Sequence, residues 1–356
     1  MLSTELITDE GDLGDLYAAW DDLAVLNSAP MAAPAWTLAW LRHLAPAGSR
    51  LRAIAVREGE ELVGLAPLFL SEDRGTFAYA TLGERQLWRV TPLSRPGRAW
   101  EVAEAAWSAL LDADPTPDVV RFRSSSLRDW YAPWHLVIGQ RPRREQPLIS
   151  HGDINPCPFT ALDGDFESWF AGRSSNFRSE MRRARRKLEE AGGTIRTSSP
   201  ETIGADLHTY VRLHLARWED KGSGFEQYGE SLPRMLVDAA RDLPPERLIL
   251  HMVELDGKPA GAQLFTEAGG MLSFHNSGWN PEHAKLKPGL VGMLHAVEQA
   301  FAQGLSRLDY GPGDYSYKLR FATGMEPVVR CTFLFPGPRL ARAAASRLAA
   351  RARRGR

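Results

Sequence analysis

The densest group of chemically capable side chains lies near the C-terminus, after a Gly-Pro-Gly turn at residues 311–313. The group comprises Asp314, Tyr315, Tyr317, Lys318 and Arg320. Lysine and arginine bind phosphate or carboxylate and stabilise an oxyanion, and a carboxylate accepts a proton or orients a base. A turn followed by a solvated strand is the alternative. So many titratable groups in so short a stretch favour a catalytic role.

A second candidate feature is a predicted helix start with proline in its first turn. It consists of Lys287, Pro288, Gly289, Leu290, Val291 and Gly292. The first N–H groups of a helix lack intrahelical partners and carry partial positive charge, so such a start suits a phosphate. Glycine lets the backbone approach a ligand closely, and proline there loses no needed N–H. The alternative is a plain helix start in which Gly292 allows close packing.

Two further groups flank this helix start. His275 and Asn276 lie in the strand predicted before it. A histidine acts as a general base near neutral pH with little change in its pKa, although a hydrogen-bonded interior histidine is the alternative. His214, Arg217 and Trp218 lie near the end of an earlier predicted helix. We expect them to line the same site, the alternative being a helix end where Arg complements the dipole and Trp packs.

Composition excludes several classes of protein. The 356 residues carry a net charge of −1, which favours no DNA partner. No CxxC, HExxH or zinc-ligand spacing occurs, so the sequence predicts no metal site. The chain has two cysteines, its first residues do not resemble a signal peptide, and no window approaches about 18 apolar residues. We therefore expect a soluble, cytoplasmic protein without a disulfide framework.

The predicted elements occur in one order twice. In the first half the pattern predicts strands over 51–57, 62–70 and 76–82, a helix over 98–111 and a strand over 118–123. In the second half it predicts strands over 248–255, 260–266 and 271–276, a helix over 290–303 and a strand over 306–310. Five elements recurring in one order indicate two α/β domains, each a mixed twisted sheet flanked by helices.

We predict four segments from this repeat: an N-terminal domain over 1–138, a Pro- and Arg-rich linker over 139–157, a C-terminal domain over 158–335 and a basic tail over 336–356. Few candidate catalytic groups surround the Pro96-Gly97 helix start of the first domain. We expect that domain to be non-catalytic and to shape the acceptor cleft. Contact of the tail with anionic lipid is expected to be electrostatic and weak.

An ordered set of motifs carries a specific resemblance. The set comprises Phe177-Arg178 with the basic helix after it, Leu213-His214 with Arg217-Trp218, Lys287-Pro288-Gly289, and Asp309-Tyr310-Gly311 with Tyr317-Lys318-Leu319-Arg320-Phe321. It resembles the acetyltransferase-like family associated with cellulose and exopolysaccharide biosynthesis. That family is a branch of the acyl-CoA N-acyltransferase (GNAT) superfamily related to Fem-type transferases. The resemblance covers residues 20–335 and is strongest over 158–325.

The resemblance implies two tandem GNAT-like domains and an acyl or aminoacyl donor. In the superfamily, the helix start that matches 287–292 holds the CoA pyrophosphate, and the strand before it splays from its neighbour. A tyrosine after the last core strand often protonates the leaving thiolate, and Tyr315 and Tyr317 occupy that place. His275 or Asp314 is then the expected base.

We therefore expect an N-acyltransferase that moves an acyl group from acyl-CoA, or from an acyl carrier protein, directly to an amine of a sugar, peptide or long-chain base. Acyl-CoA is a co-substrate in this scheme, and no cofactor is tightly bound. The absence of a convincing Ser-His-Asp or Cys-His arrangement agrees with direct transfer. Two alternatives stay open. One is a Fem-type enzyme that binds aminoacyl-tRNA through the basic helix 178–187, and the other is a non-catalytic ligand-binding module.

Overall fold

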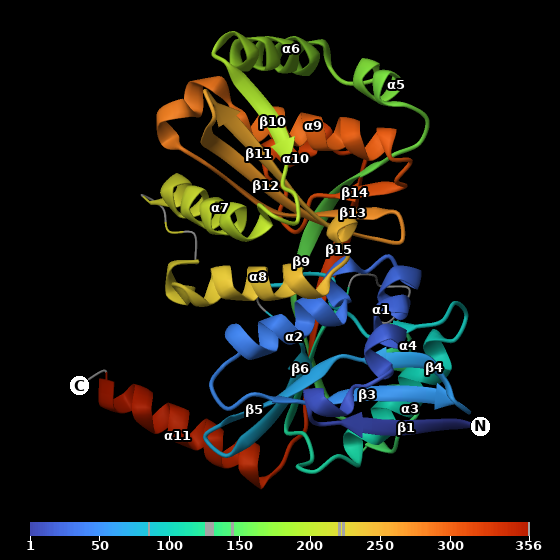
Figure 1. Ribbon diagram of the computed structural model, residues 1–356. Helices are drawn as coiled ribbons and strands as arrows, with labels where there is room; N and C mark the ends of the chain where they lie inside the picture. The colour runs from blue at the N-terminus through green and yellow to red at the C-terminus, as the bar shows by residue number, and fades with distance from the viewer. Residues whose placement is uncertain (85, 125–131, 144–145, 220–221, 223–224, 355–356) are drawn as a thin grey trace. The chain divides into compact units, whose positions relative to one another are not determined.

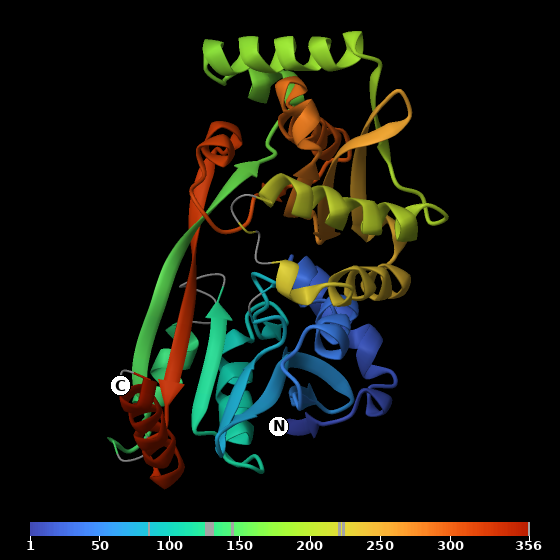
Figure 2. The ribbon, with the colours of Figure 1, turned by 90° about the vertical axis from the view of Figure 1, so that its left-hand side faces the viewer.

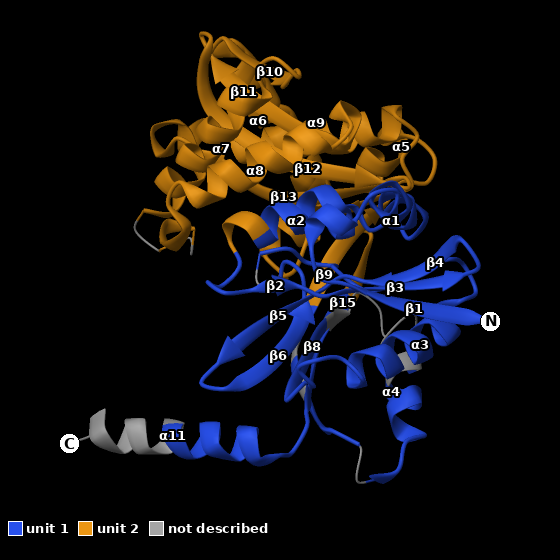
Figure 3. Ribbon diagram, turned by 60° about the horizontal axis from the view of Figure 1, so that its bottom comes forward, with its two compact units in different colours: residues 1–41, 45–155, 327–356 blue, residues 42–44, 156–326 orange. Residues whose placement is uncertain are grey.

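The computed structural model describes residues 1–84, 86–124, 132–143, 146–219, 222 and 225–354. The chain divides into two compact units (Figure 3). Unit 1 comprises residues 1–41, 45–155 and 327–356, and unit 2 comprises residues 42–44 and 156–326. Two long strands, β9 (Leu148–Ala161) and β15 (Gly324–Leu334), each contribute residues to both units.

Unit 1 contains two groups of paired strands. One has the order β1-β3-β4-β7, formed by β1 (Leu2–Ile7), β3 (Ala53–Glu58), β4 (Glu61–Ala66) and β7 (Leu93–Ser94). The other has the order β15-β8-β6-β5-β2, with β8 (Val119–Ser124), β6 (Thr76–Thr81), β5 (Leu68–Asp73) and β2 (Arg50–Leu51). The helices are α1 (Leu16–Leu26), α2 (Pro34–His43), α3 (Ala99–Leu111), α4 (Ala132–Gly139) and α11 (Pro338–Arg354). Trp36 and Trp40, four residues apart on α2, are both buried.

One predicted strand of unit 1 is wrong in its extent. The segment predicted as a single strand over 62–70 forms β4 and β5, which pair in different sheets, with Pro67 between them. Proline offers no N–H to a ladder and restricts the residue before it, so the pairing changes at this residue. The Pro67 carbonyl still accepts a hydrogen bond from the N–H of Leu82 at 2.9 Å.

The passage predicted as a linker over 139–157 is instead partly regular structure. It begins at the end of α4 and continues into β9, while residues 144–145 lie outside the described residues. Two prolines within β9, Pro156 of this passage and Pro158 just after it, are accommodated because their carbonyls still accept hydrogen bonds. Pro158 accepts from the N–H of Tyr310 at 3.0 Å and Pro156 from that of Gly313 at 2.8 Å.

Most of the predicted basic tail is α11. Near its start, Arg339 donates to the carboxylate of Asp118 at 3.0 Å and to Thr116 at 2.9 Å within unit 1. Residues 355–356 lie outside the described residues. In the described chain, no helix combines the length and apolar character needed to cross a bilayer.

Unit 2 is built on a mixed sheet in the order β10-β11-β12-β13-β14-β9. Its strands are β10 (Gly193–Thr197), β11 (Leu248–Leu255), β12 (Lys258–Ala268), β13 (Met271–Trp279) and β14 (Arg307–Asp309), together with β9. Helix α9 (Pro288–Ala302) covers one face of β11–β13 and α7 (Ile203–Trp218) covers the other, with α6 (Ser175–Glu190) outside α9 (Figures 1 and 2). The order of elements predicted for this half is present.

Local signals explain where the helices of unit 2 begin. Asp165 caps α5 (Phe166–Ala171) by accepting from the N–H of Ser168 at 2.7 Å. Ser174 caps α6 in the same way, accepting from Phe177 at 3.3 Å. The apolar stripe of α6 then points inward through Phe177, Met181, Ala184 and Leu188, all buried.

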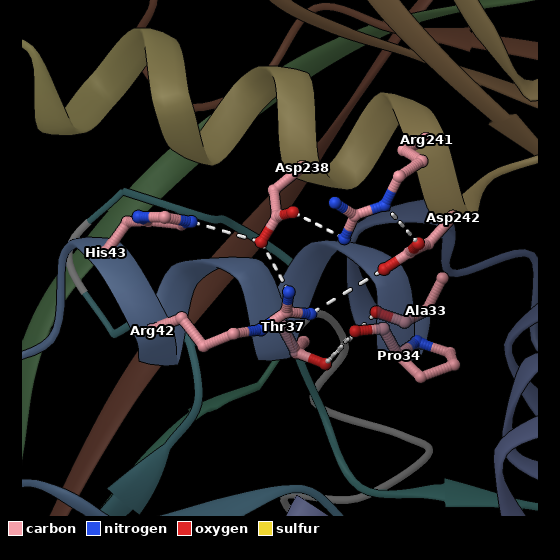
Figure 4. A network of polar contacts seen from close by, with 8 residues as sticks. All are labelled: Ala33, Pro34, Thr37, Arg42, His43, Asp238, Arg241 and Asp242. Carbon is pink, nitrogen blue, oxygen red and sulfur yellow. Dashed lines mark hydrogen bonds and ion pairs between the residues drawn. The ribbon is translucent and has the colours of Figure 1, made fainter.

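Helix α8 (Ser231–Asp242) carries a cluster of charges around Asp238 (Figure 4). Asp238 accepts from Arg42 and from His43 Nε2 at 3.0 Å, and Arg241 lies 2.5 Å away. Residues 42–44, which include the end of α2, accordingly belong to unit 2. The earlier part of α2 lies in unit 1, where the Thr37 hydroxyl donates to the backbone carbonyls of Ala33 and Pro34.

Candidate active site

The sheet of unit 2 opens between β13 and β14. These two strands pair in parallel only at residues 271–273 and 307–309, although β13 continues to Trp279. The separation coincides with a bulge, because Phe274 opposes Phe265 and Asn276 opposes Leu264, which leaves His275 as an extra residue on β13. A bulge bends its strand and increases the local twist. The end of β13 therefore diverges from β14, as the sequence resemblance predicts.

A cavity of about 260 Å³ lies beside the diverging end of β13. It is lined by Arg217, Ser277, Trp279, Ala284, Lys287, Pro288, Gly289, Leu290, Met293 and Tyr317. These residues come from the end of α7, the end of β13, the 3-10 helix Pro281–Leu286, the start of α9 and the short helix α10 (Ser316–Phe321). Six predicted site residues, widely separated in the sequence, thus share one cavity.

The start of α9 forms one wall of this cavity. Lys287 adopts the left-handed conformation with φ of 54°, and Pro288 occupies the first turn. Gly289 cannot carry a larger side chain without displacement, because a Cβ there would lie 2.9 Å from the Trp279 ring. The Leu290 and Val291 N–H groups donate to the Lys287 carbonyl at 3.0 and 3.1 Å. The positive end of the helix dipole and the Lys287 ammonium favour an anion at this start.

Val291 and Gly292, predicted to bind the cofactor, do not line the cavity. Val291 packs in the core with Ala184 and Leu188 of α6. A Cβ at Gly292 would lie 2.0 Å from Oε1 of buried Gln263, so this glycine serves close packing of α9 on β12. Both side chains thus face neighbouring elements and point away from the cavity. The sequence motif does not show which face of α9 each residue occupies.

Arg217 links α7 to the exposed edge of β13. It donates to the Ser277 hydroxyl at 2.9 Å and to the Ser277 carbonyl at 3.3 Å. Its guanidinium lies 3.6 Å from the centroid of the Trp279 ring and 4.9 Å from that of Trp218. Burial lowers the pKa of Arg217 to about 10, so the side chain is cationic at neutral pH. Trp218 supports Arg217 from outside the cavity.

His214 contributes to the scaffold of the site and does not line the cavity. Its Nδ1 lies 2.9 Å from the Ser277 carbonyl, and its ring stacks on Phe225 with centroids 4.3 Å apart. Burial lowers the pKa of His214 to about 4, so the ring is neutral at pH 7. Helix α7 approaches β13 closely here, as a Cβ added at Gly278 would lie only 2.2 Å from the backbone nitrogen of His214.

The remaining predicted residues of β13 are buried or bonded locally. His275 is buried at the bulge, and burial followed by the charge of His214 lowers its pKa to about 4. The Asn276 side chain accepts from the N–H of Ser277 at 3.0 Å. Neither residue lines the cavity.

The segment after β14 presents its two tyrosines differently. Tyr317 lines the cavity, and burial raises its pKa to about 12, so its hydroxyl keeps its proton at neutral pH. Tyr315 is 58% exposed and stacks on Tyr317 with ring centroids 6.3 Å apart. Asp314 is exposed in the turn before α10. Tyr317, and not Tyr315, is therefore the tyrosine of this segment that lines the cavity.

Lys318 turns inward, toward the backbone of the Gly-Pro-Gly turn. Its Nζ donates to the carbonyls of Pro312 at 2.8 Å and Gly311 at 3.2 Å, and the residue is 6% exposed. Burial lowers the pKa of Lys318 to about 8. Asp309 holds the same turn by accepting from the Gly311 N–H at 2.8 Å. Lys318 therefore holds the Gly-Pro-Gly turn, and its neighbour Tyr317 is the residue that lines the cavity.

A carboxylate absent from the sequence hypotheses joins two cations of the site. Glu180 of α6 accepts from Lys287 Nζ at 2.5 Å through Oε1 and from Arg320 through Oε2. These hydrogen bonds, Arg320 first, hold the pKa of Glu180 at about 2. Lys287 belongs to the cavity wall and Arg320 to α10, so Glu180 ties two sides of the site together.

Sequence reasoning missed five residues of the site: Glu180, Ser277, Trp279, Ala284 and Met293. Alternation along β13 could have found two of them, because Ser277 and Trp279 follow His275 at intervals of two. Glu180 is the one acid among the basic residues of the predicted helix 178–187 and adjoins its apolar stripe. That position was the available signal for a partly buried ion pair.

Comparisons with known proteins agree with this geometry. Residues 175–319 match a family model described as "Acetyltransferase (GNAT) domain". No curated protein matches the sequence. The fold is similar to that of FemX, with 13% identity, a TM-score of 0.66 and coverage of 93% of this chain and 97% of that one.

Two other solved structures share the fold over nearly the whole chain. L-PGS from Bacillus licheniformis has 12% identity and a TM-score of 0.58, covering 97% of this chain and 99% of that one. The C-terminal domain of a proposed lysylphosphatidylglycerol synthetase from Agrobacterium fabrum has 10% identity and a TM-score of 0.56, covering 95% of each. The predicted fold class, a GNAT-like α/β fold with mixed sheets flanked by helices, is confirmed.

Proposed function

We propose that the chain is a GNAT-type N-acyltransferase that moves an acyl group from acyl-CoA directly to an amine. The observation that carries this proposal is the cavity beside the diverging end of β13, where it meets the start of α9. The acceptor classes proposed are the amines of a sugar, a peptide or a long-chain base. The narrower kinship with the branch associated with cellulose and exopolysaccharide biosynthesis belongs to the same proposal and rests on the motifs quoted above.

The donor would use both the positively charged start of α9 and the apolar lining of the cavity. Its diphosphate suits the start of α9, where the positive end of the helix dipole and Lys287 supply positive charge. Pro288, Leu290, Met293 and the Trp279 ring give the cavity an apolar lining for the arm or the acyl chain. Acyl-CoA is a co-substrate here, and an acyl carrier protein is a second carrier with the same arm.

In the proposed reaction the acceptor nitrogen attacks the thioester carbonyl, the new C–N bond forms and the C–S bond breaks. Tyr317 donates its hydroxyl proton to the leaving sulfur, for which its raised pKa of about 12 keeps it protonated. The amine proton goes to a base, with His275 and Asp314 as candidates. His275 is neutral at pH 7, as a base must be, but its lowered pKa makes it weakly basic. Asp314 is exposed to solvent.

A second candidate donor is aminoacyl-tRNA, bound by the cations of α6. The specific observation in its favour is that Arg182, Arg183, Arg186 and Lys187 are exposed on that helix. Against it, Arg185 pairs with Glu298 at 2.7 Å and Arg178 donates to backbone carbonyls. Binding of tRNA that weakens steeply with salt, without binding of CoA, would favour this donor.

The test is isothermal titration with acetyl-CoA, a long-chain acyl-CoA and free CoA, using the wild type and Gly289→Asp. Aspartate there would contact the Trp279 ring and bring negative charge to the anion site, so we expect the variant to lose binding. Gly204→Asp is the matched control, because a Cβ at this helical glycine of α7 meets no atom within 4 Å. Equal CoA binding by the wild type, Gly289→Asp and Gly204→Asp would contradict a donor site at the start of α9. Binding of the donor without acylation of any amine would favour a ligand-binding module.

A further inference from the structure

Glu180 contacts the wall of the cavity in which the donor is proposed to bind. Its carboxylate contacts Lys287, which lines the cavity, and Arg320, which extends from α10. The Glu180 side chain is 16% exposed, while those of Lys287 and Arg320 are 40% and 34% exposed. The acid is thus the most enclosed member of the three, and the two cations reach toward solvent.

The position of Glu180 on α6 explains why it points inward. It follows Phe177 by three residues and precedes Ala184 by four, and both of these neighbours are buried. Its side chain therefore lies at the border of the apolar stripe that packs toward α9. A second α6–α9 ion pair, between Arg185 and Glu298 at 2.7 Å, involves no residue of the cavity wall and provides an internal comparison.

The charges of this group set a condition for any anion that binds there. Glu180 supplies one negative charge to two cations, so the group has one positive charge in excess. A single phosphodiester that displaces Glu180 replaces one negative charge with another and gains little. A diphosphate brings two negative charges and matches both cations.

We propose that Glu180 determines donor specificity by competing for Lys287 and Arg320, so that a diphosphate donor such as CoA uses these cations and a single phosphodiester does not. This inference rests on the proposed acyl-CoA donor and names a property of the same site. A phosphopantetheine arm attached to a carrier protein holds one phosphodiester. Glu180 therefore disfavours carrier-bound donors relative to CoA.

The test compares three ligands that share the pantetheine arm: pantetheine, the methyl ester of 4′-phosphopantetheine and dephospho-CoA. They carry no phosphate, one phosphodiester and one diphosphate. Isothermal titration gives the gain in affinity that each phosphate group adds to pantetheine. In the wild type we expect no gain from the phosphodiester and a gain of about tenfold or more from the diphosphate. In Glu180→Gln we expect the phosphodiester to raise the affinity about three- to tenfold over pantetheine, because no carboxylate then competes for Lys287 and Arg320.

Glu298→Gln is the control, because it breaks the other α6–α9 ion pair and should reproduce the wild-type pattern. Glu180→Asp provides a second variant in case Glu180→Gln fails to fold. The shorter Asp side chain cannot reach both cations as Glu180 does, but it still supplies a negative charge. We therefore expect a phosphodiester gain that is smaller in Glu180→Asp than in Glu180→Gln. Thermal unfolding reports whether each variant is folded.

Two results overturn the inference separately from the proposed function. One is a phosphodiester gain already present in the wild type, and the other is weaker dephospho-CoA binding by the folded Glu180→Gln variant. The second result means that Glu180 positions Lys287 for the donor and does not compete with it. If neither the wild type nor any variant binds CoA or dephospho-CoA, the proposed donor fails as well.

Discussion

The guanidinium carbon of Arg217 lies 3.6 Å from the centroid of the Trp279 ring, and a Cβ at Gly289 would lie 2.9 Å from the same ring. This stacking joins the end of α7, the end of β13 and the start of α9 in one wall of the cavity. Each of these elements is held by its own packing, and the stacked pair sets the distance between them. The geometry of the cavity therefore depends on a planar cation at position 217.

Replacing Arg217 with Lys should weaken donor binding. A lysine keeps the charge but loses the planar face that stacks on Trp279 and the fixed fork that reaches Ser277. We expect KM for the acyl donor to rise about tenfold, with a smaller change in kcat. Steady-state kinetics measure both, and Arg212→Lys on the exposed side of α7 is the control. An unchanged KM would show that the stack does not shape the donor site.

Replacing Tyr317 with Phe should lower kcat about 10- to 100-fold and leave KM nearly unchanged, because the hydroxyl acts on the leaving sulfur. Tyr315→Phe is the matched control and should retain activity, since that side chain is 58% exposed. Because burial raises the pKa of Tyr317 to about 12, the wild-type kcat should show no loss from this group below about pH 10. The reverse pattern in the two variants would assign the proton donor to Tyr315.

Replacing Gly278 with Ala should destabilise unit 2. The added Cβ would lie 2.2 Å from the backbone nitrogen of His214, and a helix backbone cannot yield as a side chain does. We expect a loss of about 1–3 kcal/mol, or more, in the free energy of unfolding. Gly204→Ala, with no atom within 4 Å of its Cβ, should be neutral or slightly stabilising. Chemical denaturation of both variants tests this, and equal stabilities contradict the close approach of α7 to β13.

Three buried histidines should make the protein sensitive to acid. Burial lowers the pKa of His214 and His275 to about 4 and that of His251 to about 3, against about 6.5 in the unfolded chain. Between these values the unfolded state binds the proton and the folded state does not. Stability is therefore complete above about pH 6.5 and falls as the pH drops toward the folded pKa values.

The slope of this loss can be assigned to single residues. Each histidine contributes about 1.4 kcal/mol per pH unit while only its unfolded form is protonated. His251→Gln removes one such group and keeps a polar side chain beside Thr197. Urea denaturation at pH 7, 6 and 5 should show a shallower decline for this variant than for the wild type. Parallel declines would mean that His251 titrates normally in the folded protein.

The sequence by itself determined much of the local structure of unit 2. Asp165 and Ser174 lie at the helix starts they cap, and β11 spans 248–255 as its hydrophobic pattern predicts. These features depend on neighbours within a few residues, such as a capping side chain or an alternation of apolar residues. The fold class then follows from the order in which these predicted strands and helices occur. The break at Pro67 and the strand β9 were missed because strand pairing depends on partners distant in the chain.

Only the tertiary structure decided which of the candidate residues share a site. Arg217, Gly289 and Tyr317 line one cavity, whereas Val291 and Gly292 pack inside, although all belong to similar motifs. Lys318 turns toward its own loop, and Glu180 reaches two cations more than 100 residues away. Side-chain direction and pairing across elements depend on packing and on charges brought together by folding. A sequence pattern gives the face of a helix or strand, and the contacts between faces arise only when the elements assemble.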